Sequence, residues 1–232
     1  MNSYRIFKVK KFPSLSDGEV INSVVNLTLP GFTENAITKI RGVSKNYFGY
    51  EYFEIDHEMF IKDSGLAFGF LDGAPVRVEF EGYKKLFIVK AFLKREENYL
   101  FLSYASFVVK DLYKKLKDNE FLKTEVIGYK LDLNKAQEII SDYTGVWFKG
   151  VSSRVSSSAL YGSDLANEPL FQQLRDDGAN LSSIIIPFKG IPIQVSDNAG
   201  ISSHHSFISI EKELNIIEEV KNELIEKLIA NV

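Results

Sequence analysis

The stretch Val76-Arg77-Val78-Glu79-Phe80-Glu81-Gly82-Tyr83 decides the fold class, because its apolar and charged residues alternate before a glycine. Alternation with a period of two places the apolar side chains on one face of a strand and the charged ones on the other. The glycine predicts a turn into the next apolar run, Leu86–Leu93. We therefore expect the fold to consist largely of antiparallel strands.

The same pattern continues on both sides of this stretch. Residues 53–59 alternate again, Asp72-Gly73 predicts a hairpin turn, and residues 99–103 form a further apolar run. We therefore expect an antiparallel meander over residues 36–103. Residues 4–11 predict an earlier strand with one face exposed to solvent.

Two helices are predicted in the first half of the chain. Ser16 and Glu19 have the spacing of a capping box, and the apolar residues that follow at 20–25 predict a helix there. Apolar residues between 107 and 116 repeat at helical spacing, with lysines mostly on the opposite side.

The second half has a similar order of elements. Strands are predicted at 126–133, 146–151, 184–188, 191–195 and 205–210, and helices at 134–143 and 209–230. Asn134 and Ser209 stand where helix caps are expected. The two halves also carry similar hairpin sequences, Phe80-Glu81-Gly82 and Phe188-Lys189-Gly190.

The predicted order in each half is strand, helix, antiparallel strands and helix, which indicates an α+β fold with two pseudo-repeated halves. The halves would span residues 1–120 and 121–232, and the second would carry a long loop over residues 152–182. This order resembles that of the TATA-binding-protein fold, in which each half is a curved sheet backed by helices. A double hotdog fold has a similar order and is the alternative.

The composition excludes several classes of protein. The 232 residues include no cysteine, which excludes a disulfide-stapled module and a zinc site built on thiolates. The formal net charge of −3 divides into +2 over residues 1–120 and −5 over residues 121–232. This balance lacks the strong basic footprint of many nucleic-acid-binding domains. Because no apolar run reaches the ~20 residues of a membrane span, we expect a cytoplasmic protein without a membrane partner.

Basic side chains interleaved with aromatic ones form the candidate binding surface. They are expected on the solvent faces of strands and in the serine-rich segment after residue 151. The residues are Lys8, Lys10, Arg77, Lys90, Lys130, Trp147, Lys149 and Arg154, with Tyr4 on the same face as the first two. On one continuous sheet they would form a surface for stacking and for phosphate contacts. Glu54, Glu79 and Glu81 fall on faces of the same kind, so a mixed-charge solvent surface is the alternative.

The sequence contains no recognisable catalytic motif. It has neither a nucleophile elbow nor a phosphate-binding glycine loop, and we expect no cofactor and no metal site. His57 lies on an apolar strand face, which predicts a core histidine. The candidate catalytic group is therefore His204 or His205, with Arg154 or Asp164 as its partner.

These observations favour a non-enzymatic binding protein that contacts a macromolecule, protein or nucleic acid, through the sheet surface and the 152–182 loop. Two alternatives stay open. One is a hydrolase or nuclease that uses the histidine pair. The other is an acidic inhibitor or accessory subunit from a mobile element, whose negative charge would cover a basic partner surface.

Overall fold

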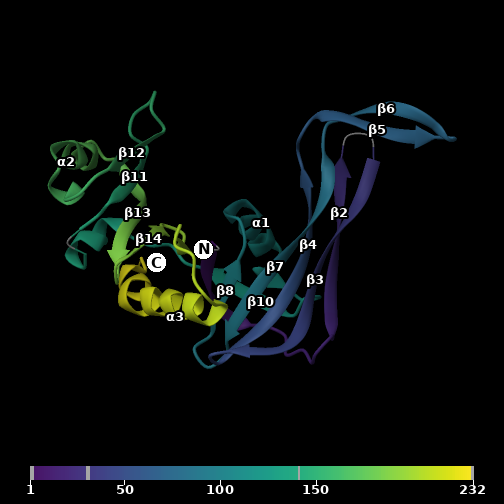
Figure 1. The fold of residues 1–232 in the computed structure, drawn as a ribbon, viewed down its shortest axis with the longest axis horizontal. Helices are drawn as coiled ribbons and strands as arrows, with labels where there is room; N and C mark the ends of the chain where they lie inside the picture. The colour runs from purple at the N-terminus through teal and green to yellow at the C-terminus, as the bar shows by residue number, and fades with distance from the viewer. Residues whose placement is uncertain (1–2, 30–31, 141, 231–232) are drawn as a thin grey trace.

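The computed structural model describes residues 3–29, 32–140 and 142–230, and within them thirteen strands form one antiparallel sheet (Figure 1). The order along the sheet is β12-β11-β13-β14-β15-β1-β8-β7-β4-β3-β2, and β10 pairs with β1 and β9. The strands are β1 (Tyr4–Lys11), β2 (Val20–Leu29), β3 (Phe32–Tyr47), β4 (Tyr50–Ile61), β5 (Gly65–Leu71), β6 (Ala74–Phe80), β7 (Tyr83–Lys94), β8 (Tyr99–Ser103), β9 (Asp118–Asn119), β10 (Thr124–Gly128), β11 (Gly145–Lys149), β12 (Ser157–Tyr161), β13 (Asn180–Phe188), β14 (Ile191–Ser196) and β15 (Gly200–Ser202). The helical elements are α1 (Ser106–Leu116), the 3-10 turns η1 (Leu133–Glu138) and η2 (Leu165–Asn167), α2 (Pro169–Asp176), α3 (Ile210–Val220), the π-helical segment η3 (Lys221–Ile225) and α4 (Glu226–Leu228).

Strand β1 lies inside the sheet although it comes first in the chain. It pairs with β8 along one edge, and along the other edge with β15 near Tyr4 and with β10 from Phe7 onward. Tyr4 and Ile6 pack into one group of buried residues, the first cluster, whereas Phe7 and Val9 pack into another, the second cluster. Because side chains alternate along a strand, the two clusters lie on opposite faces of β1. Tyr4 is only 1% exposed, so its predicted place on a solvent face is wrong.

Helix α1 covers the second cluster. Its buried side chains are Val108, Val109, Leu112 and Leu116, and they pack against residues of β1, β3, β4, β7 and β8. The helix predicted at 107–116 is therefore confirmed. Phe107 itself is 54% exposed, because the buried stripe begins one residue later.

The antiparallel meander predicted over residues 36–103 is confirmed, since β3, β4, β7 and β8 are neighbours in the sheet. The helix predicted after Ser16 is wrong, because residues 20–29 form β2 and pair with β3. The Ser16 N–H does donate to Glu19 Oε2, at 2.9 Å, but this bond belongs to a turn. The β-branched residues that follow favour a strand once β3 offers a partner.

Strands β5 and β6 form a separate two-stranded sheet at the far end of β4 and β7 (Figure 1). Asp72 and Gly73 make the predicted turn between them, with φ of 50° and 80°. Strand β6 alternates as predicted, but it pairs with β5, whereas β7 pairs with β4. Phe68 and Phe70 on β5 are 83% and 80% exposed, so this hairpin carries apolar side chains outside the core.

The second half is built around the hairpin of β13 and β14, which turns at Lys189-Gly190 as predicted. The 3-10 turn η1 begins after Asp132, whose side chain accepts a hydrogen bond from the Asn134 N–H at 3.2 Å. The cap is therefore Asp132, not Asn134. The segment 152–182 is not a plain loop, because it contains β12, the 3-10 turn η2 and α2.

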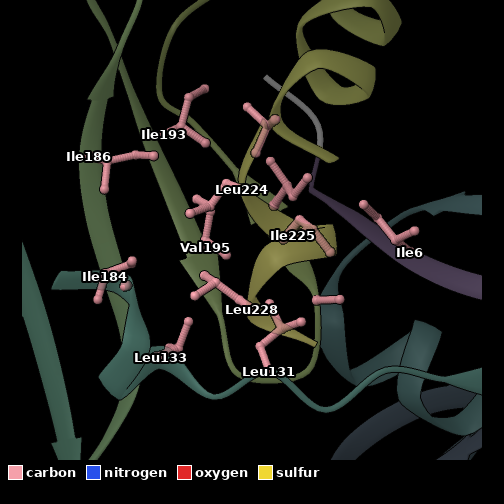
Figure 2. Packing of buried hydrophobic residues seen from close by; sticks show 14 of the residues in the cluster. Ile6, Leu131, Leu133, Ile184, Ile186, Ile193, Val195, Leu224, Ile225 and Leu228 are labelled. Atoms are coloured by element: carbon pink, nitrogen blue, oxygen red, sulfur yellow. The ribbon is translucent and has the colours of Figure 1, made fainter. Parts of the chain in front are cut away.

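The C-terminal helical segments close the first cluster. Ser209 caps α3 as predicted, accepting a hydrogen bond from the Lys212 N–H at 3.3 Å. The buried stripe continues through η3 into α4, and Figure 2 shows its last residues facing the hairpin of β13 and β14. The stripe contains Leu214, Ile217, Val220, Leu224 and Leu228. The strand predicted at 205–210 is wrong, because the last strand, β15, ends at Ser202 and α3 begins at Ile210.

A buried lysine of η3 links the C-terminal helical segments to the turn between β7 and β8. Lys221 is 1% exposed, and its Nζ lies 2.6 Å from Glu97 Oε2 and 3.3 Å from Glu226 Oε1. The same Nζ lies 4.0 Å from the centre of the Tyr99 ring. Lys94 contacts Glu97 at 2.9 Å. We call these five residues the Lys221 clamp.

The α+β class and the large antiparallel sheet are thus confirmed. The first half, however, runs from β1 directly into β2, without the helix that the predicted half-repeat places there. The element order of the described chain therefore differs from the one that led us to the TATA-binding-protein and double hotdog folds.

Candidate functional site

The C-terminal strands bury one face against α3 and expose the other. On β11, Val146 and Phe148 are buried in the first cluster, so Trp147 and Lys149 point to the opposite side. We call this opposite side the open face. Its side chains are Arg5, Trp147, Lys149, Tyr161, Ser183, Gln194, Ser196 and Ser202.

An aromatic pair marks the outer end of the open face. Trp147 on β11 and Tyr161 on β12 meet edge to face, with ring centroids 5.3 Å apart and planes at 85°. Tyr161 is 66% exposed and Trp147 is half-buried. The pair therefore holds its rings in fixed positions while leaving aromatic surface in contact with solvent.

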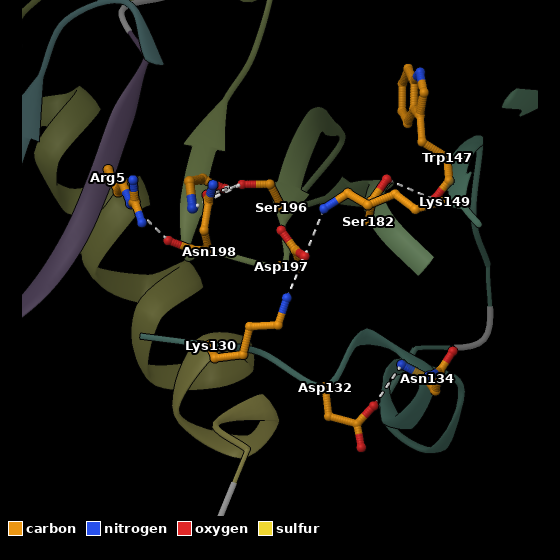
Figure 3. A network of polar contacts seen from close by, with 11 residues as sticks. Arg5, Lys130, Asp132, Asn134, Trp147, Lys149, Ser182, Ser196, Asp197 and Asn198 are labelled. Atoms are coloured by element: carbon orange, nitrogen blue, oxygen red, sulfur yellow. Dashed lines mark hydrogen bonds and ion pairs between the residues drawn. The ribbon is translucent and has the colours of Figure 1, made fainter. Parts of the chain in front are cut away.

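Two lysines converge on one carboxylate beside this pair (Figure 3). Asp197 Oδ2 lies 2.6 Å from Lys130 Nζ and 2.9 Å from Lys149 Nζ. Backbone hydrogen bonds fix the aspartate, because its N–H donates to Ser182 O at 3.0 Å and its carbonyl accepts from the Leu131 N–H at 2.7 Å. Asp197 therefore sets the position of both ammonium groups.

Lys130, Lys149 and Asp197 together carry a local charge of +1, which the neighbouring Asp132 offsets. Burial alone would raise the pKa of Asp197, but hydrogen bonds from Lys130 and Lys149 outweigh it and hold that pKa below its ordinary value. The aspartate is thus ionised at neutral pH, and two ammonium groups share one negative charge. Their side chains are 66% and 58% exposed, so either can leave Asp197 for an anionic ligand.

A surface hollow of about 500 Å³ lies at the lysine cluster. It is lined by Lys130, Asp132, Asn134, Lys149, Asn180 and Asp197, among others. These side chains include donors and acceptors, but none is a buried nucleophile held by a base. The hollow thus presents ammonium, carboxylate and amide groups that can bind a polar ligand.

The structure gathers three of the eight predicted binding residues, Lys130, Trp147 and Lys149. The others lie elsewhere. Lys8 and Lys10 are exposed on the face of β1 that holds Tyr4 and Ile6, which is the side of α3. Lys10 is also paired with Glu125 at 2.7 Å.

The remaining three predicted binding residues are separate from this cluster. Lys90 on β7 is half-buried and lies opposite Glu54 of β4. Arg77 is exposed on β6 of the distant hairpin, opposite Phe68. Arg154 is exposed in the turn between β11 and β12, where its N–H donates to a serine hydroxyl. The predicted surface is therefore split between several parts of the sheet.

The histidines follow the predictions in part. His57 is fully buried, with Nδ1 3.0 Å from Thr38 Oγ1 and Nε2 3.2 Å from Asp111 Oδ2, so the predicted core histidine is confirmed. Burial lowers its pKa, and the Asp111 carboxylate opposes that shift. His204 and His205 are exposed after β15, and the His205 ring lies 4.9 Å from that of Phe207.

In the described ranges, no hydrogen bond or ion pair joins His204 or His205 to Arg154 or Asp164. Asp164 Oδ1 instead accepts from Asn167 Nδ2 at 2.7 Å. Among the described residues, no group of three or more His, Asp or Glu side chains is arranged to hold a metal ion. No helix in the described part of the chain is long and apolar enough to cross a membrane.

Sequence reasoning missed Asp197 and Tyr161. Asp197 stands in the turn between β14 and β15, and nothing in its local sequence links it to lysines 48 and 67 positions away. Tyr161 closes the serine-rich segment, where only alternation over residues 157–161 could have indicated an edge strand.

Comparison with known proteins gives no match, either to a family or to an individual curated protein.

Proposed function

We propose that this chain is a non-enzymatic binding protein that holds a macromolecule on the open face and on the adjoining segment 152–182. One observation carries the proposal: Trp147 and Tyr161 present solvent-accessible rings beside Lys149. Binding of this kind does not require that the two halves of the chain be duplicates.

Single-stranded nucleic acid is the partner that this arrangement favours. Each base has an apolar face that can stack on an aromatic ring, and such stacking contributes about 1–3 kcal/mol per base. Lys130 and Lys149 stand where a phosphate next to a stacked base can replace the carboxylate of Asp197. The exposure of both lysines allows that exchange without unfolding of the strands.

Trp147 supplies the test, because it is the only tryptophan of the chain and its fluorescence reports on this site alone. Short single-stranded DNA and RNA added at low salt should quench it. Log affinity should fall with log salt concentration, with a slope of about −0.7 per phosphate contact. Lys149→Gln should make that slope shallower by about 0.7, and Tyr161→Ala should weaken binding at every salt concentration.

Lys90→Gln is the matched control, because it removes the same charge from a strand outside the site. It should bind like the wild type. If neither DNA nor RNA changes Trp147 fluorescence at low salt, the nucleic-acid version of the proposal is wrong.

A protein partner is the second candidate, and the 46% exposure of Val155, in the turn between β11 and β12, favours it. In that case Val155→Asp and Tyr161→Ala should each abolish co-purification of a partner from the native host, while Lys149→Gln should not. This result would also fit the accessory-subunit alternative. The hydrolase alternative predicts loss of activity in a His204→Ala, His205→Ala double variant.

A further inference from the structure

A second polar hollow lies between β1, the region of β14 and β15, and the start of α1. Its volume is about 260 Å³, and none of its lining residues, all within the described ranges, is an aspartate or a glutamate. The side chains that matter here are Ser3, Arg5, Ser106, Gln194, Asn198 and Ser202. Gln194 Nε2 donates one hydrogen to Ser183 Oγ at 2.9 Å, and Ser202 Oγ donates to Gln194 Oε1 at 3.4 Å. The remaining donors at the hollow therefore belong mainly to Ser3, Arg5, Ser106 and Asn198.

Arg5 is the only charged side chain of this hollow, and its guanidinium is held in place. Its Nε donates to Asn198 O at 3.1 Å, as Figure 3 shows, and its Cζ lies 5.2 Å from the Phe7 ring centre and 5.7 Å from that of Tyr113. Within the described chain, no carboxylate lies within ion-pair distance of it. Burial lowers its pKa, with Tyr113 and Asp197 opposing the shift, yet an arginine stays charged at neutral pH.

The floor of the hollow is held together by hydrogen bonds among Ser196, Asn198 and Gly200. Ser196 Oγ donates to Asn198 Oδ1 at 2.7 Å, which occupies the amide oxygen and leaves the amide nitrogen as a donor. Ser196 Oγ also accepts from the Gly200 N–H at 3.0 Å. A Cβ at Gly200 would collide with Ser196 Oγ, so glycine is what allows this tight turn under the hollow.

We propose that this hollow binds a phosphate group, with Arg5 as the charged fork and the hydroxyl and amide donors around it. A planar guanidinium matches a tetrahedral oxyanion through parallel hydrogen bonds. The space equals that of about nine waters at ~30 Å³ each, so it admits a phosphate with a small substituent but not a whole nucleotide. The hollow lies on the open face at its β1 and β15 end, whereas the Trp147 pair lies at the β11 and β12 end, and the phosphate proposal does not depend on the nucleic-acid proposal.

Calorimetric titration of the whole chain with inorganic phosphate, at constant ionic strength set with chloride, tests the proposal. Wild type should show saturable binding. Arg5→Gln should weaken it by about tenfold or more, the loss expected for a charge-assisted hydrogen bond. Arg77→Gln removes the same charge from an exposed arginine on the distant hairpin and should bind like the wild type.

Ser106→Asp keeps the test valid if Arg5→Gln fails to fold. An acidic residue in the first turn of α1 is favourable for the helix, yet it places a negative charge at the hollow. It should raise the thermal midpoint slightly and abolish phosphate binding. Phosphate binding that persists unchanged in both variants would overturn the proposal.

A second arm identifies the source of the phosphate. Oligonucleotides with and without a 5′-phosphate are compared by anisotropy in wild type and Arg5→Gln. A preference for the 5′-phosphate that Arg5→Gln removes indicates the end of a strand. Saturable binding of inorganic phosphate without that preference indicates a small phosphorylated molecule. Absence of both effects in wild type refutes the phosphate site, and Trp147 quenching still tests the open face independently.

Discussion

The Lys221 clamp allows a stability prediction, because its ammonium group is buried while its carboxylate partners are partly exposed. Lys221→Met keeps most of the aliphatic stem and removes the charge. Glu97 and Glu226 are 38% and 42% exposed, so both can be rehydrated, and Glu97 keeps its contact with Lys94. The loss in the free energy of unfolding should therefore be smaller than the ~3–5 kcal/mol expected when a fully buried ion pair loses one partner.

The individual contributions set the expected size. A hydrogen bond to a charged group contributes about 1.5–3 kcal/mol, and an ammonium over an aromatic ring about 0.5–2 kcal/mol. Removing the buried ammonium also removes its desolvation cost, which offsets part of that loss. We expect Lys221→Met to lower the free energy of unfolding by about 1–2 kcal/mol. Lys221→Ala also deletes three buried methylenes at ~0.8 kcal/mol each, so its cost should be about 3–4 kcal/mol.

Urea unfolding at neutral pH, followed by circular dichroism and by Trp147 fluorescence, measures both variants. The thermal midpoint should fall by about 2–4 °C per kcal/mol in a chain of this size. Lys227→Met, at an exposed position of α4, is the control and should be nearly neutral. If Lys221→Met is as stable as the wild type, the ion pairs do not outweigh desolvation and the reasoning is wrong.

Three further predictions concern other parts of the molecule. The pKa of Asp197 is lowered in the folded protein, so its stabilising effect is present above the ordinary value of 3.8 and is lost as pH falls through the folded pKa. Asp197→Asn should therefore flatten the acid unfolding curve in this pH range, and an unchanged curve would contradict the prediction. Phe171 is fully buried, so Phe171→Ala should cost about 3–5 kcal/mol in chemical unfolding, and a cost below 1 kcal/mol would show that the site collapses around the gap. Phe68→Ser with Phe70→Ser should change the free energy of unfolding by less than about 0.5 kcal/mol per site while raising solubility, and a large loss would mean that the hairpin is packed in solution.

Local patterns in the sequence were sufficient where the backbone follows them directly. Alternation indicated the meander, the helical stripe indicated α1, and Ser209 indicated the start of α3. These patterns failed where the same local sequence pattern can precede either a helix or a strand. Ser16 and Glu19 form the same hydrogen bond before a strand that they form before a helix, and only pairing with β3 decides between the two.

The residue types of the candidate site could be predicted from the sequence, but the position at which they meet could not. Lys130, Trp147 and Lys149 were identified because strand alternation left them on a solvent face. Their convergence depends on Asp197, which comes from a turn far along the chain. The Arg5 hollow was not predictable at all, because its lining comes from residues 3–5, 104–109 and 194–202.

The position of β1 has a consequence for how the chain is made. Strand β1 is synthesised before its partners β8, β10 and β15, the last of which ends at Ser202. At ~5–20 residues per second, synthesis of the intervening chain takes on the order of 10–40 s. Throughout that time, the strands that pair with β1 and cover Tyr4 and Ile6 have not all been synthesised. A nascent chain held at residue 190 should therefore leave its N-terminus open to proteases, and one released beyond residue 230 should protect it.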